Sequence, residues 1–128
     1  MPALAVMARV AALIPDLLFG SKVQSALEGA GHEVDLITGE LEAWDEVGGI
    51  DLLVIDLTSP DVNGVELFEA LAAGGELHEV RSVGFFAHVE PEVRKRALQA
   101  GFDLVVPRSR MAREGAQLVE GLLAGDGG

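Results

Sequence analysis

Asp56 stands at the far end of the most apolar stretch of the chain, and this position makes it the strongest candidate for chemistry. Residues 52–55 read Leu-Leu-Val-Ile, and Leu57 follows the acid. Such a run is typical of a strand that is buried on both faces of a parallel sheet. Ligands of open α/β sheets bind beyond the carboxyl ends of the strands, so a carboxylate at this end is a candidate reactive group. Asp51, at the opposite end of the run, is expected to be a solvated start signal.

The residues after Asp56 follow a regular spacing. Pro60 comes four residues after the acid, Gly64 comes four residues after Pro60, and an amphipathic helix opens at residues 65–67. This order resembles the receiver domain of two-component response regulators, and the resemblance extends over residues 8–123. It implies that Asp56 is the phosphoacceptor candidate, and that Pro60 and Gly64 are the turn and helix-opening residues.

The resemblance also implies a pocket around Asp56. Receiver domains accept a phosphoryl group from a histidine kinase, a reaction that depends on charge neutralisation more than on acid–base chemistry. The family uses Mg²⁺ held by an acidic pair after the first strand, a Ser or Thr after the fourth strand and a Lys after the fifth. In this sequence the implied pocket residues are Asp16, Thr58, Phe86, Ala87 and Arg108.

The chain departs from the family pattern at the metal site. The acidic pair falls on Ile14 and Pro15, and only a shift of one residue brings a carboxylate, Asp16, into place. Mg²⁺ would then have Asp16, Asp56 and the Thr58 carbonyl as protein ligands. Because Mg²⁺ demands near-ideal octahedral oxygen coordination, we expect no cofactor, or Mg²⁺ held weakly by Asp16 and Asp56.

Two further positions depart from the pattern. The hydroxyl position falls on Phe86, or on Ala87 after a shift of one residue, and neither side chain can hydrogen-bond a phosphate. The lysine position is Arg108, a wide planar fork rather than a compact charge. We expect Arg108 to lie at the same edge as Asp56, where it either meets an anion or pairs with unmodified Asp56.

Strand and helix patterns alternate regularly along the chain. Residues 1–6 are expected to be a leader, residues 7–123 a receiver-like domain and residues 124–128 a disordered tail. The alternation predicts a flavodoxin-like, doubly wound five-stranded parallel α/β sheet with strand order 2-1-3-4-5. The predicted strands are 8–14, 33–37, 51–57, 82–86 and 103–106, and the predicted helices are 19–30, 40–47, 64–73, 90–100 and 111–122.

Composition limits the classes of function. The 128 residues suit one domain, and 49% hydrophobic residues with a mean hydropathy of +0.33 argue against a disordered chain. No apolar run is long enough to cross a bilayer. The absence of cysteine fits a reducing, cytoplasmic location, and a net charge of −12 argues against nucleic-acid binding.

The leading interpretation is a pseudo-receiver of a two-component phosphorelay that acts through protein–protein interaction. Its expected partner surface is formed by the helix 90–100, the strand 103–106 and the helix 111–122; a histidine kinase and a second copy in a homodimer are the partners considered. The alternative is a competent receiver that a histidine kinase phosphorylates on Asp56.

An enzyme on the same fold is the third interpretation, and the sequence disfavours it. It has no cysteine and no serine in a nucleophile elbow. A flavin site would need a first loop rich in Ser and Thr, which is here Ile-Pro-Asp at 14–16. His32, His78 and His88 have no metal-ligand spacing and are expected at the surface.

Overall fold

The chain folds around one five-stranded parallel sheet with strand order β2-β1-β3-β4-β5. The structure is a computed structural model that describes residues 7–87 and 90–125, so the expected leader, His88 and residues 126–128 lie outside the described residues. The observed order and direction confirm the flavodoxin-like prediction. The strands are β1 (Arg9–Leu13), β2 (Glu33–Ile37), β3 (Leu52–Asp56), β4 (Arg81–Phe86) and β5 (Leu104–Pro107).

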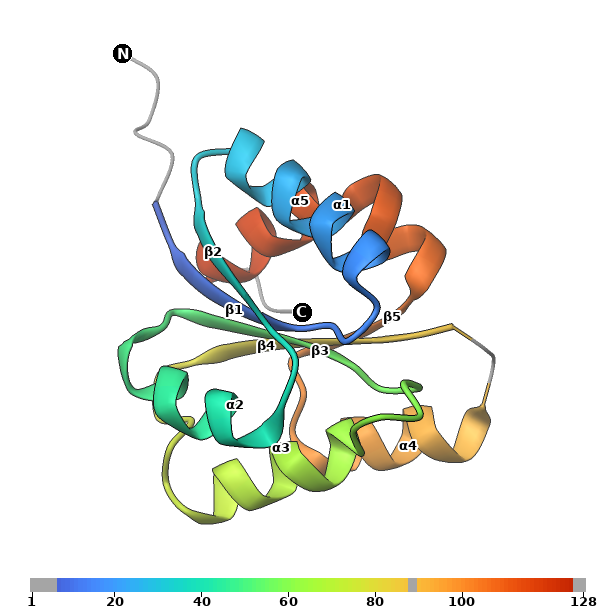
Figure 1. Cartoon of the computed structure of the whole chain (residues 1–128). Helices are drawn as coiled ribbons and strands as arrows, with labels where there is room; N and C mark the ends of the chain where they lie inside the picture. The colour runs from blue at the N-terminus through green and yellow to red at the C-terminus, as the bar shows by residue number, and fades with distance from the viewer. Residues whose placement is uncertain (1–6, 88–89, 126–128) are drawn as a thin grey trace.

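Helices cover both faces of the sheet, as Figure 1 shows. One face carries α1 (Leu17–Gly29) and α5 (Arg108–Leu123). The other face carries α2 (Glu40–Glu46), α3 (Gly64–Ala73) and α4 (Pro91–Ala100), and α3 lies between the other two. Within residues 7–87 and 90–125, none of the helices combines the length and the apolar character that a membrane span requires.

The apolar strand residues divide between two core layers because successive side chains of a strand point to opposite faces. On β3, Leu52 and Val54 belong to the layer beneath α1 and α5, whereas Leu53 and Ile55 belong to the layer beneath α2, α3 and α4. All four side chains are fully buried. The alternation directs Asp56, the next residue of even number, toward the α1 and α5 side of the sheet.

Element ends differ from the sequence prediction by one to three residues, and the largest difference is at α5, which begins at Arg108 and not at residue 111. Asp51 precedes β3, and its carboxylate is not merely solvated, because its Oδ2 accepts a hydrogen bond from the backbone N–H of Arg9 at 2.9 Å. The glycines after α2 continue it as a 3-10 turn, Val47–Gly49. The backbone N–H groups of Ala124 and Gly125 hydrogen-bond to carbonyls of the last turns of α5, although the sequence assigned both residues to the tail.

The prediction that His32 lies at the surface is wrong. The side chain is only 5% exposed, and its Nδ1 accepts a hydrogen bond from the backbone N–H of Ala8 at 3.2 Å. The ring therefore satisfies a backbone donor just before β1, a contact between residues 24 positions apart. His78 is exposed, as expected.

Gly64 allows α3 to start directly against the end of β3. A β-carbon on Gly64 would lie 2.6 Å from Cγ2 of Ile55 and 2.9 Å from the backbone oxygen of Asp56. The preceding Asn63 caps the helix, since its Oδ1 accepts a hydrogen bond from the N–H of Glu66 at 3.0 Å. This close approach holds the loop between β3 and α3 beside Asp56.

We therefore expect Gly64→Ala to lower the free energy of unfolding by about 1–3 kcal/mol, the usual cost of overpacking a tight site. Gly121→Ala is the matched control, because nothing lies within 4 Å of a β-carbon at that helical position. The control should leave stability unchanged or raise it by up to about 1 kcal/mol through helix propensity. Urea unfolding of both variants measures the difference, and equal stability of the two would contradict the packing argument.

Candidate functional site

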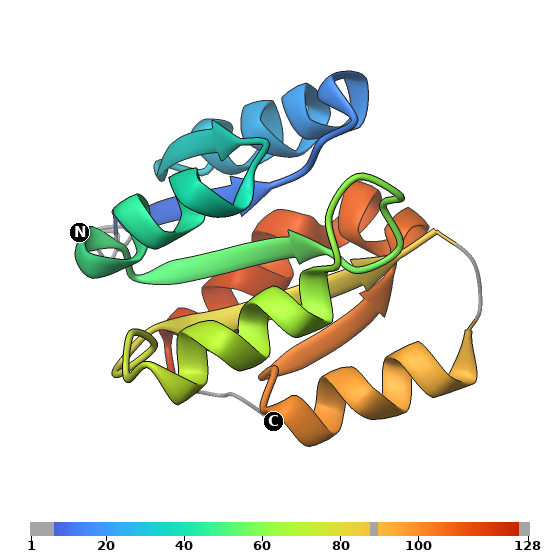
Figure 2. The ribbon, with the colours of Figure 1, turned by 60° about the horizontal axis from the view of Figure 1, so that its bottom comes forward.

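A cavity of about 260 Å³ opens at the carboxyl edge of the sheet. Figure 2 shows the strands with their arrowheads on one side, where the loop after β3 arches over their ends. The cavity gathers residues that follow β1, β3, β4 and β5. It is lined by Pro15, Asp16, Asp56, Thr58, Ser59, Pro60, Asp61, Ala87 and Arg108.

The predicted pocket residues meet at this cavity with one exception. Phe86 is absent from the described residues that line it; its ring packs in the core layer beneath α3 and α4. It borders instead a neighbouring cavity of about 620 Å³ that also contacts Phe19, Lys22 and Arg108. Of the two residues considered for the hydroxyl position, Ala87 is therefore the one beside Asp56.

Asp56 is a buried carboxylate with few hydrogen-bond donors. It is 7% exposed, and its Oδ1 accepts hydrogen bonds from the backbone N–H of Thr58 at 3.0 Å and from the Thr58 hydroxyl at 3.5 Å. Burial raises the pKa of Asp56, because the charged form loses its water. The Thr58 N–H and the positive charge of Arg108 oppose that rise without reversing it.

The hydroxyl of Thr58 connects two loops of the site. It donates to Asp56 and accepts a hydrogen bond from the backbone N–H of Ala87 at 2.8 Å. The sequence predicts Thr58 as a pocket residue and gives its carbonyl a ligand role, but it assigns no contact to the hydroxyl. A hydroxyl two residues after the acid is a visible signal, but its contact with a residue 29 positions later is not.

Arg108 pairs with Asp16, and the alternative that it pairs with Asp56 is wrong. Its Nη2 lies 2.9 Å from Oδ2 of Asp16, and its guanidinium carbon lies 4.0 Å from the centre of the Phe19 ring. This geometry combines an ion pair with a cation–π contact. The hydrogen bond from Arg108 and that from the Phe19 N–H hold the pKa of Asp16 below its usual value.

Asp16 also caps α1. Its Oδ1 accepts hydrogen bonds from the backbone N–H groups of Leu18 at 3.1 Å and Phe19 at 3.2 Å, which satisfies donors that the first turn leaves free. One carboxylate oxygen thus serves the helix and the other serves Arg108. The sequence places Asp16 near the site but does not show that both of its oxygens have partners.

The carboxylate oxygens that these contacts leave without a partner do not fit a resident Mg²⁺. Both oxygens of Asp16 accept hydrogen bonds, and one oxygen of Asp56 accepts from Thr58. Within residues 7–87 and 90–125, no group of three or more His, Cys, Asp or Glu side chains is arranged to hold a metal ion. A hard divalent cation prefers several oxygen ligands, and in this arrangement both Asp16 oxygens already serve Arg108 and the first turn of α1.

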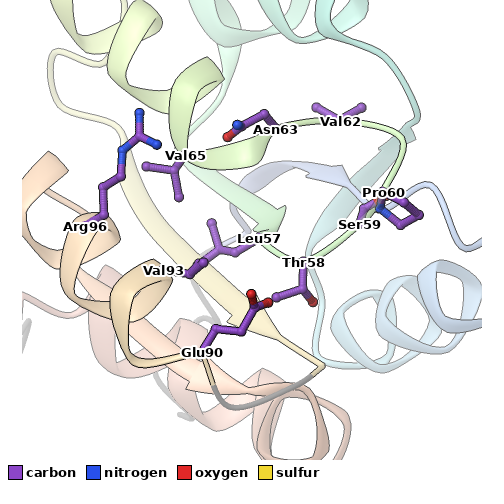
Figure 3. A pocket seen from close by; sticks show the side chains of 10 residues that line it. All are labelled: Leu57, Thr58, Ser59, Pro60, Val62, Asn63, Val65, Glu90, Val93 and Arg96. Atoms are coloured by element: carbon purple, nitrogen blue, oxygen red, sulfur yellow. The ribbon is translucent and has the colours of Figure 1, made fainter.

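A second cavity, of about 350 Å³, lies on the other side of Thr58 (Figure 3). Leu57, Val65 and Val93 form its apolar part, and Glu90 and Arg96 stand at its margin. Arg96 forms an ion pair with Glu69 at 2.8 Å. Asp56 is not among its lining residues in the described part of the chain, so this groove is separate from the candidate site.

Comparison with known proteins identifies the fold. No protein-family model and no curated protein matches the sequence. A CheY-like response regulator receiver domain protein from Methanospirillum hungatei matches with a TM-score of 0.80 and 19% identity, over 92% of this chain and 94% of that chain. A two-component response regulator of the LuxR family from Aurantimonas matches with a TM-score of 0.79 and 24% identity, over 93% and 86% of the two chains.

A receiver domain from Mycobacterium tuberculosis gives the same result. Its TM-score is 0.75 and its identity 22%, over 88% of this chain and 93% of that chain. The likeness covers nearly the whole of each domain, so the fold of this chain is the fold of response-regulator receivers.

The burial of Asp56 predicts that Asp56→Asn raises the free energy of unfolding at pH 7. Asparagine keeps an oxygen for the Thr58 N–H and carries no buried charge. Because the folded-state pKa is raised, wild-type stability falls as pH rises from the ordinary Asp pKa, about 3.9, through the folded value. The extra stability of Asp56→Asn over the wild type should thus be fully present above this pH range and disappear below it.

Urea unfolding at pH 7 and at low pH measures this difference. Asp61→Asn is the matched control, because Asp61 lines the same cavity but is exposed. It should leave stability near that of the wild type at both pH values. A less stable Asp56→Asn at neutral pH would show that the Asp56 charge is well solvated or paired.

The double role of Asp16 predicts a ranked series of variants. Asp16→Asn keeps a capping oxygen but loses the ion pair, whereas Asp16→Ala loses both, so stability should fall in the order wild type, Asn, Ala. The pKa of Asp16 is lowered, so the wild-type advantage over Asp16→Asn is present above the ordinary Asp pKa and is lost as pH falls through the folded value. Thermal unfolding across acidic pH measures both effects, and equal stability of the Asn and Ala variants would refute the cap.

Proposed function

Because the chain has the receiver fold, we propose that it is a receiver-like signalling domain of two-component type with a degenerate pocket. In this proposal it acts through protein–protein contacts, and not as an enzyme or by regulated phosphorylation of Asp56. The observation that carries the proposal is the Asp16–Arg108 ion pair with the Phe19 ring beneath the guanidinium. It ties up Asp16 and Arg108, two of the charged side chains that line the cavity beside Asp56.

Phosphoryl transfer to a carboxylate depends on cations that neutralise the charge of the incoming group. Ile14 and Pro15 stand where the family has its acidic pair, and Arg108 is held by Asp16 and the Phe19 ring. The pKa of Asp56 is raised, which also disfavours a charged nucleophile relative to a solvated aspartate. Each of these facts weakens Asp56 as an acceptor.

The side chain that would couple a phosphate on Asp56 to a change at the surface is also missing. Ala87, at the end of β4, has no hydroxyl, and its backbone N–H already donates to Thr58. A phosphate on Asp56 would thus find no hydroxyl at the end of β4, and the contact that joins Asp56 to this end is the Thr58 hydroxyl. The competent-receiver alternative keeps one favourable observation, which is that Asp56 ends β3 at the carboxyl edge of the sheet and lines a cavity there.

The proposed partner surface for signalling is the face formed by α4, β5 and α5. On α4 the side chains of Arg94, Lys95 and Leu98 are exposed, Leu98 by 43%. This mixture of basic and apolar side chains suits a protein partner, such as a histidine kinase, or a second copy of this chain. None of the described residues of α4 lines the Asp56 cavity, so docking on α4 does not require chemistry at Asp56.

Incubation with a small-molecule phosphodonor and Mg²⁺, followed by intact mass measurement, tests the proposal. We expect no mass gain of one phosphoryl group in the wild type and in Asp56→Asn. A phosphoryl adduct that is present in the wild type and absent from Asp56→Asn would overturn the proposal and favour the competent receiver.

A restored variant tests whether the three departures cause the loss. Pro15→Asp, Ala87→Thr and Arg108→Lys together return the acid, the hydroxyl and the compact cation that the family uses. The triple variant should gain one phosphoryl group under the same conditions, and the addition of Asp56→Asn should remove it. Urea unfolding of the triple variant is the control for folding, and its stability should match that of the wild type.

A further inference from the structure

The helix α2 carries two large apolar side chains that are exposed to solvent. Leu41 is 82% exposed and Trp44 is 39% exposed, whereas Ala43 and Val47 on the inner side are buried. Leu41 and Trp44 are three positions apart, so they lie on the same flank of the helix. Aromatic residues exposed in this way are common anchors of protein interfaces.

Trp44 is held in place by the end of α3. A β-carbon on Gly74, the C-cap residue of α3, would lie 3.3 Å from Cη2 and 3.4 Å from Cζ3 of the indole. The ring therefore packs closely over a position that has no side chain. This contact orders the indole before any partner arrives, so binding on its outer side costs little side-chain entropy.

Carboxylates surround the two apolar side chains. Glu40, Glu42, Asp45 and Glu46 all belong to α2. The sequence has no lysine or arginine between Lys22 and Arg81. The pKa of Glu46 is raised, chiefly by its hydrogen bond with Asp35 of β2, and Arg9 offsets this only in part. A like-charged neighbourhood of this kind favours a cationic partner.

We propose that α2 and the adjoining end of α3 form a docking surface for a basic amphipathic helix of a partner protein. The apolar side of that helix would pack on Leu41 and Trp44, and its lysines or arginines would pair with the carboxylates of α2. The net charge of −12 opposes a second copy of this chain as the occupant.

This docking surface is independent of the α4, β5 and α5 face of the proposed function. Figure 1 shows α3 between α2 and α4, so partners on the two faces would not compete for the same elements. The groove between α4 and the loop after β3 is a weaker candidate, because its arginine is already paired with Glu69. On α2 the charge and the apolar side chains point to one class of partner.

The single tryptophan of the chain makes this proposal directly measurable. The probe is a synthetic helical peptide of leucine and lysine, without tryptophan, whose leucines repeat at the spacing of one helix face. Titration should shift the Trp44 emission to shorter wavelength and reduce its quenching by acrylamide, because the peptide covers the indole. A peptide with glutamate in place of every lysine should cause neither change.

Matched variants locate the binding site. Leu41→Ser should weaken binding of the lysine peptide about tenfold, as expected for the loss of one buried apolar contact. Leu98→Ser removes an exposed leucine on α4 and should leave binding unchanged. Asp45→Lys should weaken binding by a similar factor, whereas Glu120→Lys, an exposed site on α5, makes the same change in net charge and should have less effect.

Three results would overturn the proposal. The first is a Trp44 emission and quenching that the lysine peptide does not alter. The second is that Leu41→Ser and Leu98→Ser bind the lysine peptide with equal affinity, or that Asp45→Lys and Glu120→Lys do. The third is self-association of the wild type, measured by sedimentation without peptide, that Leu41→Ser abolishes, because a second copy would then be the occupant.

Discussion

The buried carboxylate of Asp56 is the constraint around which the carboxyl edge of the sheet is arranged. It ends a strand whose four preceding residues are fully buried, so it cannot turn into bulk water without breaking β3. Burial of a charge is costly unless donors replace the lost water. Here the replacement comes mainly from Thr58, whose hydroxyl in turn binds the end of β4. The loop after β3 is therefore shaped by the needs of one side chain.

The ion pair between Asp16 and Arg108 fixes the position of the cation at this edge. Asp16 precedes α1, Arg108 begins α5, and both helices lie on the same face of the sheet. Helix capping and the Phe19 ring fix both partners, so the cation stays on the α1 side of the cavity. The electrostatic effect of Arg108 on Asp56 persists, but it acts at a distance and is smaller than the effect of burial.

Charge divides the surface of the molecule into two regions. The α2 region carries carboxylates with no lysine or arginine between Lys22 and Arg81, whereas α4 carries Arg94 and Lys95. The two regions lie on the same face of the sheet and α3 separates them. A small domain with such a division of charge offers separate surfaces to partners of opposite charge.

The sequence alone determined the architecture, because hydrophobic periodicity and glycine positions act locally. The apolar run before Asp56 predicted a central parallel strand, and the Pro60 and Gly64 spacing predicted the turn and the helix that follow. The strand order was confirmed because alternating strands and helices of this length allow few right-handed arrangements. Residues 52–64 were thus enough to place Asp56 at the carboxyl edge of the sheet.

Only the tertiary structure decided which side chains pair at that edge. The Arg108–Asp16 contact joins residues 92 positions apart, and the Thr58 hydroxyl meets a backbone N–H 29 positions later. His32 was expected at the surface, yet it is buried, and its Nδ1 accepts a hydrogen bond from the backbone N–H of Ala8, 24 positions away. A hydrogen bond or ion pair between distant segments is lost when the distance between its two atoms changes by more than a few tenths of an ångström. Residue type and spacing set the elements, whereas packing of the elements sets those distances.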